Sequence, residues 1–243
     1  MNKDSATGSN MSPETRREIV KWIVQSALGL VGYAIILFLA AGTLDWIWGW
    51  VLLAVLGAFL AAHPLILIPI NPELLAQREK GLLEKGVKPW DRWVAFFGGG
   101  ILPMASWIVA GLDVRFGWTG PLPLAVHLGG LAAMVLGFAQ FLWAMASNAF
   151  FAVGVRIQTE RGHTVAPGGP SRFVRHPGYS GAILALVATP FLLGSLWALI
   201  PALAGSALYV LRTALEDRTL RAELPGYEAF THQTRYRLVP RVW

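Results

Sequence analysis

The stretch PGYSGAILALVATPFLLGSLWALIPALAGSALYVLRTAL, residues 177–215, decides the fold of this chain. Its only charged side chain is Arg212, near the end. A helix needs about 20 apolar residues to cross a bilayer, so this stretch has the length of two crossings. Leu193-Gly194-Ser195 interrupts it near the middle, and glycine is common where a helix ends. The stretch therefore predicts a tight hairpin of two membrane-spanning helices.

Further apolar runs precede this hairpin, and the composition of the whole chain agrees with them. Of the 243 residues, 55% are hydrophobic and 14% are charged, whereas soluble domains carry about 25% charged residues. We predict an all-α, polytopic integral membrane bundle of about six transmembrane helices, or five if the hairpin does not cross fully. The first 18 residues are expected to form a disordered cytoplasmic tail. The other predicted spans lie within residues 19–147, at about 19–42, 46–70, 93–112 and 121–146.

The basic residues are distributed very unevenly between the predicted loops. With six spans, Arg115 lies on one side of the membrane and all the other Lys and Arg residues lie on the opposite side. Basic residues concentrate on the cytoplasmic side, so both termini are expected in the cytoplasm. The net charge of +6 then reflects membrane topology, and we expect no nucleic acid partner. The chain has no cysteine, which excludes disulfides and thiolate nucleophiles.

A segment of about thirty residues without an apolar run, Asn148–His176, precedes the hairpin. Connections of this length in a compact protein are usually functional or disordered. It ends in Arg175-His176-Pro177, and proline favours the first position of a helix. The helix N-terminus beside Arg175 and His176 is suited to bind an anion. A basic membrane flank followed by a proline helix start remains the alternative.

A second charged group lies where the last apolar span ends. Arg212 and Glu216 are four residues apart, on one helix face, and Asp217 and Arg221 pair similarly on another. Charged residues at the inner end of a span tend to face a polar cavity. An interfacial salt bridge of well under about 1 kcal/mol is the alternative.

Other sequence features suggest packing or solvation more than chemistry. His63-Pro64 in the second span is interpreted first as a kink and second as part of a substrate tunnel, and Gly98-Gly99-Gly100 as helix packing or a kink. Glu73, Glu79 and Glu84, with their neighbouring lysines, are expected on a solvated face. The histidines lack metal-ligand spacing, so we predict no metal site.

Several motifs of the last hundred residues together resemble the isoprenylcysteine carboxyl methyltransferase family. They are Arg161-Gly162-His163, Gly169-Pro170, Arg172, Arg175-His176-Pro177, Tyr179, Gly181, Arg212, Glu216, Leu220, Pro225-Gly226-Tyr227 and Arg235-Tyr236-Arg237-Leu238-Val239-Pro240. The family is integral to membranes and uses S-adenosylmethionine, with S-adenosylhomocysteine as product. One departure is Ser171, where the family commonly has tyrosine. The aromatic contact is then lost, or it is supplied by Phe173.

The resemblance implies that residues 148–243 form the cofactor-binding and catalytic part. The catalytic residues would be Arg212, Glu216 and His176, with Arg212 facing the methyl acceptor. The partners would be membrane lipids and a lipophilic or lipidated acceptor. The cofactor pocket would be lined by His163, Pro170, Arg175, His176, Tyr179, Gly181, Glu216, Tyr227 and Tyr236.

These residue types suit the groups of S-adenosylmethionine. Arg175 with the helix N-terminus can take the carboxylate, and Glu216 can accept from the ammonium or the ribose hydroxyls. A tyrosine ring can stack on adenine or attract the sulfonium. Arg212 can orient a carboxylate acceptor, whereas a thiol or amine acceptor needs a base, for which Glu216 or His176 is suited.

Two other classes of function stay open at this point. An NADPH-dependent sterol-type membrane reductase resembles this family in its C-terminal hairpin, and the tail offers Arg235, Arg237 and Arg241 for extra phosphates. A non-catalytic transporter or scaffold is the other alternative. Transporters tend to carry ionisable residues in the middle of their spans, and these spans carry almost none there.

Overall fold

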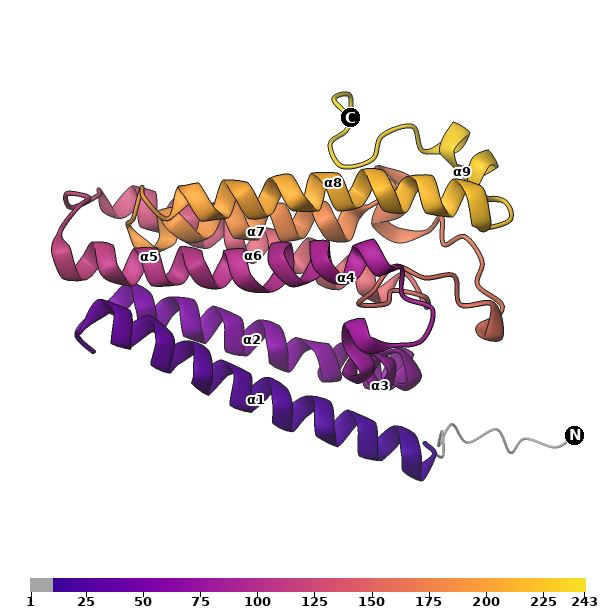
Figure 1. Cartoon of the computed structure of the whole chain (residues 1–243), viewed down its shortest axis with the longest axis horizontal. Coiled ribbons are helices and arrows are strands. Elements are labelled where there is room, and N and C mark those ends of the chain that lie inside the picture. The colour runs from indigo at the N-terminus through magenta and orange to yellow at the C-terminus, as the bar shows by residue number, and fades with distance from the viewer. Residues whose placement is uncertain (1–10) are drawn as a thin grey trace, which may run out of the picture.

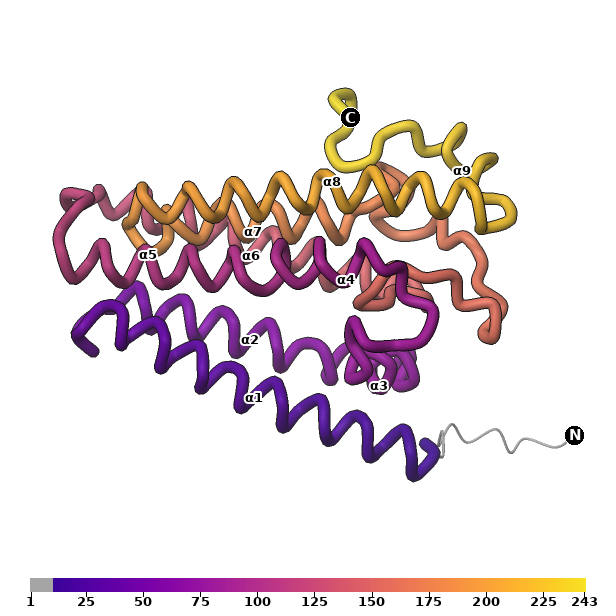
Figure 2. Tube along the Cα trace, in the orientation of Figure 1, coloured from indigo at the N-terminus to yellow at the C-terminus, as the bar shows by residue number. Residues whose placement is uncertain are grey.

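The computed structural model describes residues 11–243. Within this range every regular element is helical, and no strand occurs. The long helices run back and forth along the length of the molecule, and α1 is tilted away from α8 (Figures 1 and 2). The long helices are α1 (Pro13–Ala41), α2 (Ile47–Ile70), α5 (Leu102–Phe116), α6 (Leu124–Ala146), α7 (Pro177–Leu193) and α8 (Leu199–Glu223), and the shorter elements are α3 (Pro72–Lys80), η1 (Gly81–Leu83), α4 (Pro89–Phe96), η2 (Phe97–Ile101), η3 (Thr159–Arg161), η4 (Gly169–Arg172) and α9 (Tyr227–Gln233).

Five helical segments are long and apolar enough to cross a membrane. They are α1, α2, the continuous segment Pro89–Phe116 that contains α4, η2 and α5, α6 and α8. Leu28, Leu39 and Leu65 on α1 and α2 are 66%, 70% and 75% exposed, which a bilayer tolerates and water does not. The protein is therefore a polytopic helical membrane protein, as predicted. The sixth apolar helix, α7, has 17 residues, at the lower limit of about 17–25 residues for a crossing.

Helix α1 begins earlier than the sequence predicted. Ser12 caps its first turn by accepting a hydrogen bond from the Thr15 N–H at 3.1 Å, and Pro13 occupies the first helical position. The expectation of a disordered tail over residues 1–18 is therefore wrong from Pro13 onward. Polar residues at the start of the helix hid its true N-terminus. Residues 1–10 of that prediction lie outside the described part of the chain.

The predicted C-terminal hairpin of two helices is present, and of the two only α8 is among the five segments long enough to span a membrane. Helix α7 ends at Leu193 because Gly194 adopts a left-handed conformation with φ 78°, and α8 begins at Leu199. Helix α7 packs closely against α6 through small residues. A Cβ on Gly137 would collide with the Gly181 backbone, and a Cβ on Gly130 with the Leu192 backbone. Such stripes of small residues let two helices approach in a membrane.

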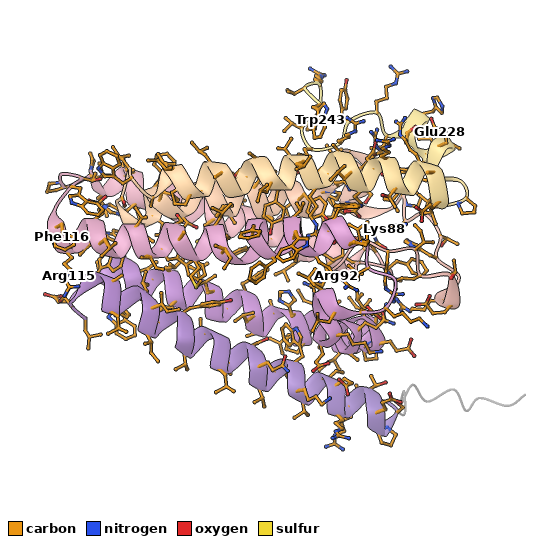
Figure 3. The ribbon with its side chains drawn as sticks, in the orientation of Figure 1. Lys88, Arg92, Arg115, Phe116, Glu228 and Trp243 are labelled. Carbon is orange, nitrogen blue, oxygen red and sulfur yellow. The ribbon has the colours of Figure 1, made fainter. Side chains whose placement is uncertain are left out.

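The two ends of the bundle differ in charge. Arg115 lies at one end, whereas Lys88, Arg92 and Glu228 lie toward the other (Figure 3). The segment between α6 and α7, helix α3 and helix α9 also lie at this second end, as does the start of α1 (Figure 1). The predicted grouping of loops is thus visible in the fold.

Among the unusual residues of the second and third spans, His63 and Gly98 have packing roles. The imidazole of His63 is buried, its Nδ1 lies 2.8 Å from the Phe59 carbonyl oxygen, and its ring contacts Trp22. Gly98 belongs to η2, a π-helical turn, where a Cβ would lie 3.1 Å from Leu208 of α8. Gly99 and Gly100, by contrast, line the cavity described next.

Candidate functional site

A cavity of about 480 Å³ lies at the end of the bundle that carries α3 and α9. Its volume falls within the range of about 300–1,000 Å³ that small-molecule sites occupy. Its lining residues come from α3, η1, α4, η2, α6, the segment 148–176, α7, α8 and α9. Both parts of the chain therefore build the cavity, although the sequence placed the site in residues 148–243 alone.

Seven of the ten residues predicted for the site line this cavity. They are His163, Arg175, His176, Tyr179, Arg212, Glu216 and Tyr227. The other three lie close by with different contacts. Pro170 is buried at the start of η4, Gly181 packs against α6, and the Tyr236 carbonyl accepts from the Arg175 backbone N–H at 2.9 Å.

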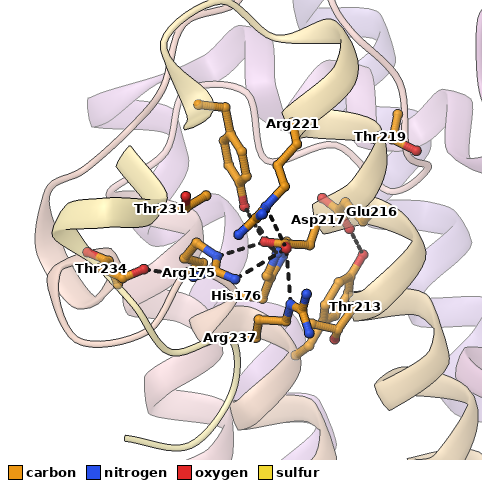
Figure 4. A network of polar contacts seen from close by, with 12 residues as sticks. Arg175, His176, Thr213, Glu216, Asp217, Thr219, Arg221, Thr231, Thr234 and Arg237 are labelled. Atoms are coloured by element: carbon orange, nitrogen blue, oxygen red, sulfur yellow. Dashed lines mark hydrogen bonds and ion pairs between the residues drawn. The ribbon is translucent and has the colours of Figure 1, made fainter. Parts of the chain in front are cut away.

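Asp217 is the centre of a buried polar network between α7, α8 and the C-terminal segment (Figure 4). Its carboxylate accepts from Arg175 Nε at 2.7 Å, from Arg237 Nε at 3.0 Å and from the Tyr227 hydroxyl at 3.1 Å. His176 Nε2 lies 3.4 Å away, and Arg221 Nε 3.3 Å. The predicted pairing of Asp217 with Arg221 is confirmed, but it is one contact of many. Asp217 was not predicted as a site residue.

The C-terminal segment is held over this end of α7 by main-chain contacts. The backbone N–H of His176 donates to the Arg237 carbonyl at 2.9 Å, and the Ser180 hydroxyl donates to the Leu238 carbonyl at 2.6 Å. Arg175 Nη1 also donates to the Thr234 and Arg235 carbonyls, at 2.8 and 2.7 Å. This segment therefore forms a fixed cover over the network.

These contacts change the expected role of Arg175. The sequence assigned its guanidinium to an anionic ligand, yet its Nε, Nη1 and Nη2 all donate to protein oxygens. The acid that neutralises it is Asp217, which lies far away in the sequence. Phe173, the suggested aromatic substitute, is 53% exposed, and Ser171 lines the cavity instead.

Arg212 is fixed by an acid that the sequence analysis missed. Its Nε and Nη2 donate to the two carboxylate oxygens of Asp91 at 2.6 and 2.8 Å, and Nη2 also donates to the Val153 carbonyl at 2.7 Å. Asp91 is fully buried in α4, and it also accepts from the Val155 N–H. An acidic residue next to the first turn of an apolar span was the signal that could have identified it.

Glu216 lines the cavity close to Arg212 but is not paired with it. Its carboxylate accepts a hydrogen bond from the Tyr179 hydroxyl, and it forms no ion pair with any residue between 11 and 243. The Arg212 guanidinium carbon lies 5.1 Å from the Tyr179 ring centroid. One cation, one carboxylate and one phenol are thus grouped at one wall of the cavity. A charged donor and a carboxylate acceptor at one wall can orient a polar ligand and accept its proton.

Two side chains that line the cavity have shifted pKa values. Burial, with the neighbouring Arg156 and Arg161 charges, lowers the pKa of His163, so this ring is neutral at pH 7. Burial, and then the nearby negative charge of Asp217, raise the pKa of Tyr227. Tyr227 therefore keeps its proton, and its hydroxyl donates a hydrogen bond to the Asp217 carboxylate.

The arrangement defines a class of protein: a polytopic helical membrane protein with a cavity, lined by both charged and apolar residues, at one end of α7 and α8. Within it, residues 130–222 match the sequence model of the isoprenylcysteine carboxyl methyltransferase family. The match confirms the predicted resemblance and supports a membrane methyltransferase. It includes Arg212 and Glu216, but not Asp91 or Tyr227. A comparison with curated proteins gives no match.

Proposed function

We propose that this protein transfers the methyl group of S-adenosylmethionine to a lipophilic acceptor that reaches the cavity from the bilayer. The observation that carries the proposal is the shared cavity. Arg212 and Glu216, one turn apart on α8, line the same space as the motif residues His163, His176 and Tyr227. Their segment matches a methyltransferase family. The orientation with both termini in the cytoplasm follows from the charge distribution and belongs to this proposal.

The residues present suit S-adenosylmethionine. Glu216 is an unpaired carboxylate at the cavity wall, suited to the cofactor's ammonium or ribose hydroxyls. The donors of Arg175 are engaged, so we assign the cofactor carboxylate to the first-turn N–H of Gly178, at the N-terminus of α7. Tyr227 and Phe230 also line the cavity and are suited to contact adenine.

The cofactor supplies an activated methyl group on a sulfonium, which becomes a thioether once the methyl group has moved to the acceptor atom. The chain's own contribution is positioning and exclusion of water. Asp91 holds the Arg212 guanidinium so that it orients the acceptor. For a thiol or amine acceptor, the Glu216 carboxylate takes the proton that the acceptor atom loses. A carboxylate acceptor has no proton to lose, and Arg212 then acts by orientation alone.

Ligand binding to the purified full-length protein tests the proposal. Calorimetry in detergent should give saturable binding of S-adenosylhomocysteine, weakened at least about tenfold by Glu216→Gln, because a hydrogen bond to a charged group is lost. Glu228→Gln is the matched control, since the Glu228 side chain is 57% exposed outside the cavity. Binding of NADPH instead would favour the reductase. Against that alternative, Arg237 of the tail already pairs with Asp217. Binding of neither ligand would contradict the proposal.

A further inference from the structure

Arg78 is a cavity residue to which the sequence assigned no role. It belongs to α3, outside the matched family segment, and it lines the same cavity as Arg212 and Glu216. Its Nη1 donates to the Phe151 carbonyl oxygen at 3.3 Å. The guanidinium carbon lies 5.9 Å from the Phe141 ring centroid and 5.7 Å from that of Phe151. Two aromatic rings and one carbonyl thus hold this cation at the wall.

Arg78 lacks the acidic partner that each of the other cavity arginines has. Arg156 pairs with Glu84 and Glu160, Arg175 pairs with Asp217, and Arg212 pairs with Asp91. Arg78 forms no ion pair within residues 11–243, and its buried Nε has no hydrogen-bond partner there. Buried charges are normally paired, and a buried donor without a partner is costly. No acid within residues 11–243 pairs with Arg78, and a ligand in the cavity is suited to supply the negative charge.

The charge balance around Arg78 favours an anion. Burial, and then the positive charge of Arg212, lower the pKa of Arg78 to about 10. The guanidinium therefore stays charged at pH 7, at the expense of repulsion from Arg212. An anionic group beside Arg78 would relieve both the desolvation and the repulsion.

Another part of the cavity lining, contributed by the third span, is apolar. Phe96, Gly99 and Gly100 of the third span line the cavity, and Phe96 is 49% exposed. A Cβ on Gly100 would meet no atom within 4 Å. One cavity therefore offers an unpaired cation and a wall of apolar and glycine residues, which together match an amphiphile with a charged head group.

We propose that Arg78 binds a negatively charged group of the methyl acceptor, whose hydrocarbon part lies against α4 and η2. This inference rests on the proposed function, and it makes Arg78 a specificity-determining residue. A carboxylate and a phosphate share the required chemistry, because a guanidinium donates two parallel hydrogen bonds to either.

The test compares matched amphiphiles with the full-length protein in lipid nanodiscs containing S-adenosylhomocysteine. The pairs are S-farnesyl-N-acetylcysteine with its carboxamide, and farnesyl monophosphate with farnesol. Wild type should bind the anionic member of one pair at least about tenfold more tightly. Arg78→Gln should remove this preference and leave S-adenosylhomocysteine affinity within about twofold. The pair that shows the effect identifies the head group.

Controls separate ligand binding from structural support. Arg92→Gln, an exposed arginine on α4, should keep the preference. If Arg78→Gln does not fold, Arg78→Lys keeps the charge but loses the paired donors, and should reduce the preference while preserving its sign. An unchanged preference in the Arg78 variants, or an equal loss for both members of a pair, would overturn the inference. Wild type without any preference would also overturn it. Failure of wild type to bind S-adenosylhomocysteine would instead count against the proposed function.

Discussion

Replacing Asp217 by alanine should be among the most destabilising single changes in this end of the bundle. The Asp217 and Arg175 side chains are 1% and 3% exposed, so the variant leaves a buried guanidinium without its acid. Breaking a buried ion pair in this way costs about 3–5 kcal/mol. The pairs with Arg237 and Arg221 add little, because those arginines are 29% and 39% exposed and exposed pairs contribute about 0–1 kcal/mol. We therefore expect a loss of about 3–5 kcal/mol in the free energy of unfolding.

The assay is denaturant unfolding in detergent, followed by tryptophan fluorescence. Asp217→Asn should lose less than Asp217→Ala, because its amide oxygen still accepts from Arg175. Glu228→Ala is the control, since its contacts with Arg221 and His232 are 3.7 and 3.8 Å long and exposed. The C-terminal segment should also become sensitive to protease after residue 224. A loss below about 1 kcal/mol for Asp217→Ala, with the segment still protected, would refute the central role of this carboxylate.

Three further predictions follow from the packing and the charges. Asp91→Asn should reduce methyl transfer by at least about tenfold, because Arg212 loses a charged bidentate partner, and activity with a saturating acceptor measures this. Gly181→Ala should destabilise the protein by about 1–3 kcal/mol in detergent unfolding, because its Cβ would collide with the Gly137 backbone, whereas Gly129→Ala has open space and should not. Because the pKa of His163 is lowered in the folded state, the unfolded chain binds a proton at this imidazole more tightly than the folded protein does. The free energy of unfolding should therefore fall as the pH decreases below about 6.5. Denaturant unfolding at several pH values should show a smaller fall in His163→Asn.

The spans could be predicted because their signals are local. Apolar length located the long apolar helices, and Gly194 marked the hairpin turn, whereas the short helices α3 and α9 were not predicted. The start of α1 at Pro13 was missed because polar residues begin a helix that hydropathy alone detects only later. The number of membrane-spanning helices, five or six, depends on α7, whose 17 residues are at the lower limit of length for a crossing.

The site was predicted less completely because its ion pairs join distant parts of the chain. Arg212 and Glu216 are neighbours on one helix face, yet Arg212 is neutralised by Asp91 from another span. Glu84, expected on a solvated face, instead pairs with the buried Arg156. Helical periodicity places residues on faces, but it carries no information about which face of a distant helix lies opposite. The role of α3, and of Arg78 in particular, was invisible for the same reason.

We propose above that the cavity between the segment 148–176, α8 and α9 binds S-adenosylmethionine. Photolabelling is the most direct test of this binding. The purified protein is irradiated with 8-azido-S-adenosylmethionine, digested, and the labelled peptides are identified by mass spectrometry. We expect label within residues 163–166 or 224–230, removed by excess S-adenosylhomocysteine and reduced in Glu216→Gln. Label confined to other segments, or label that S-adenosylhomocysteine does not displace, would contradict it.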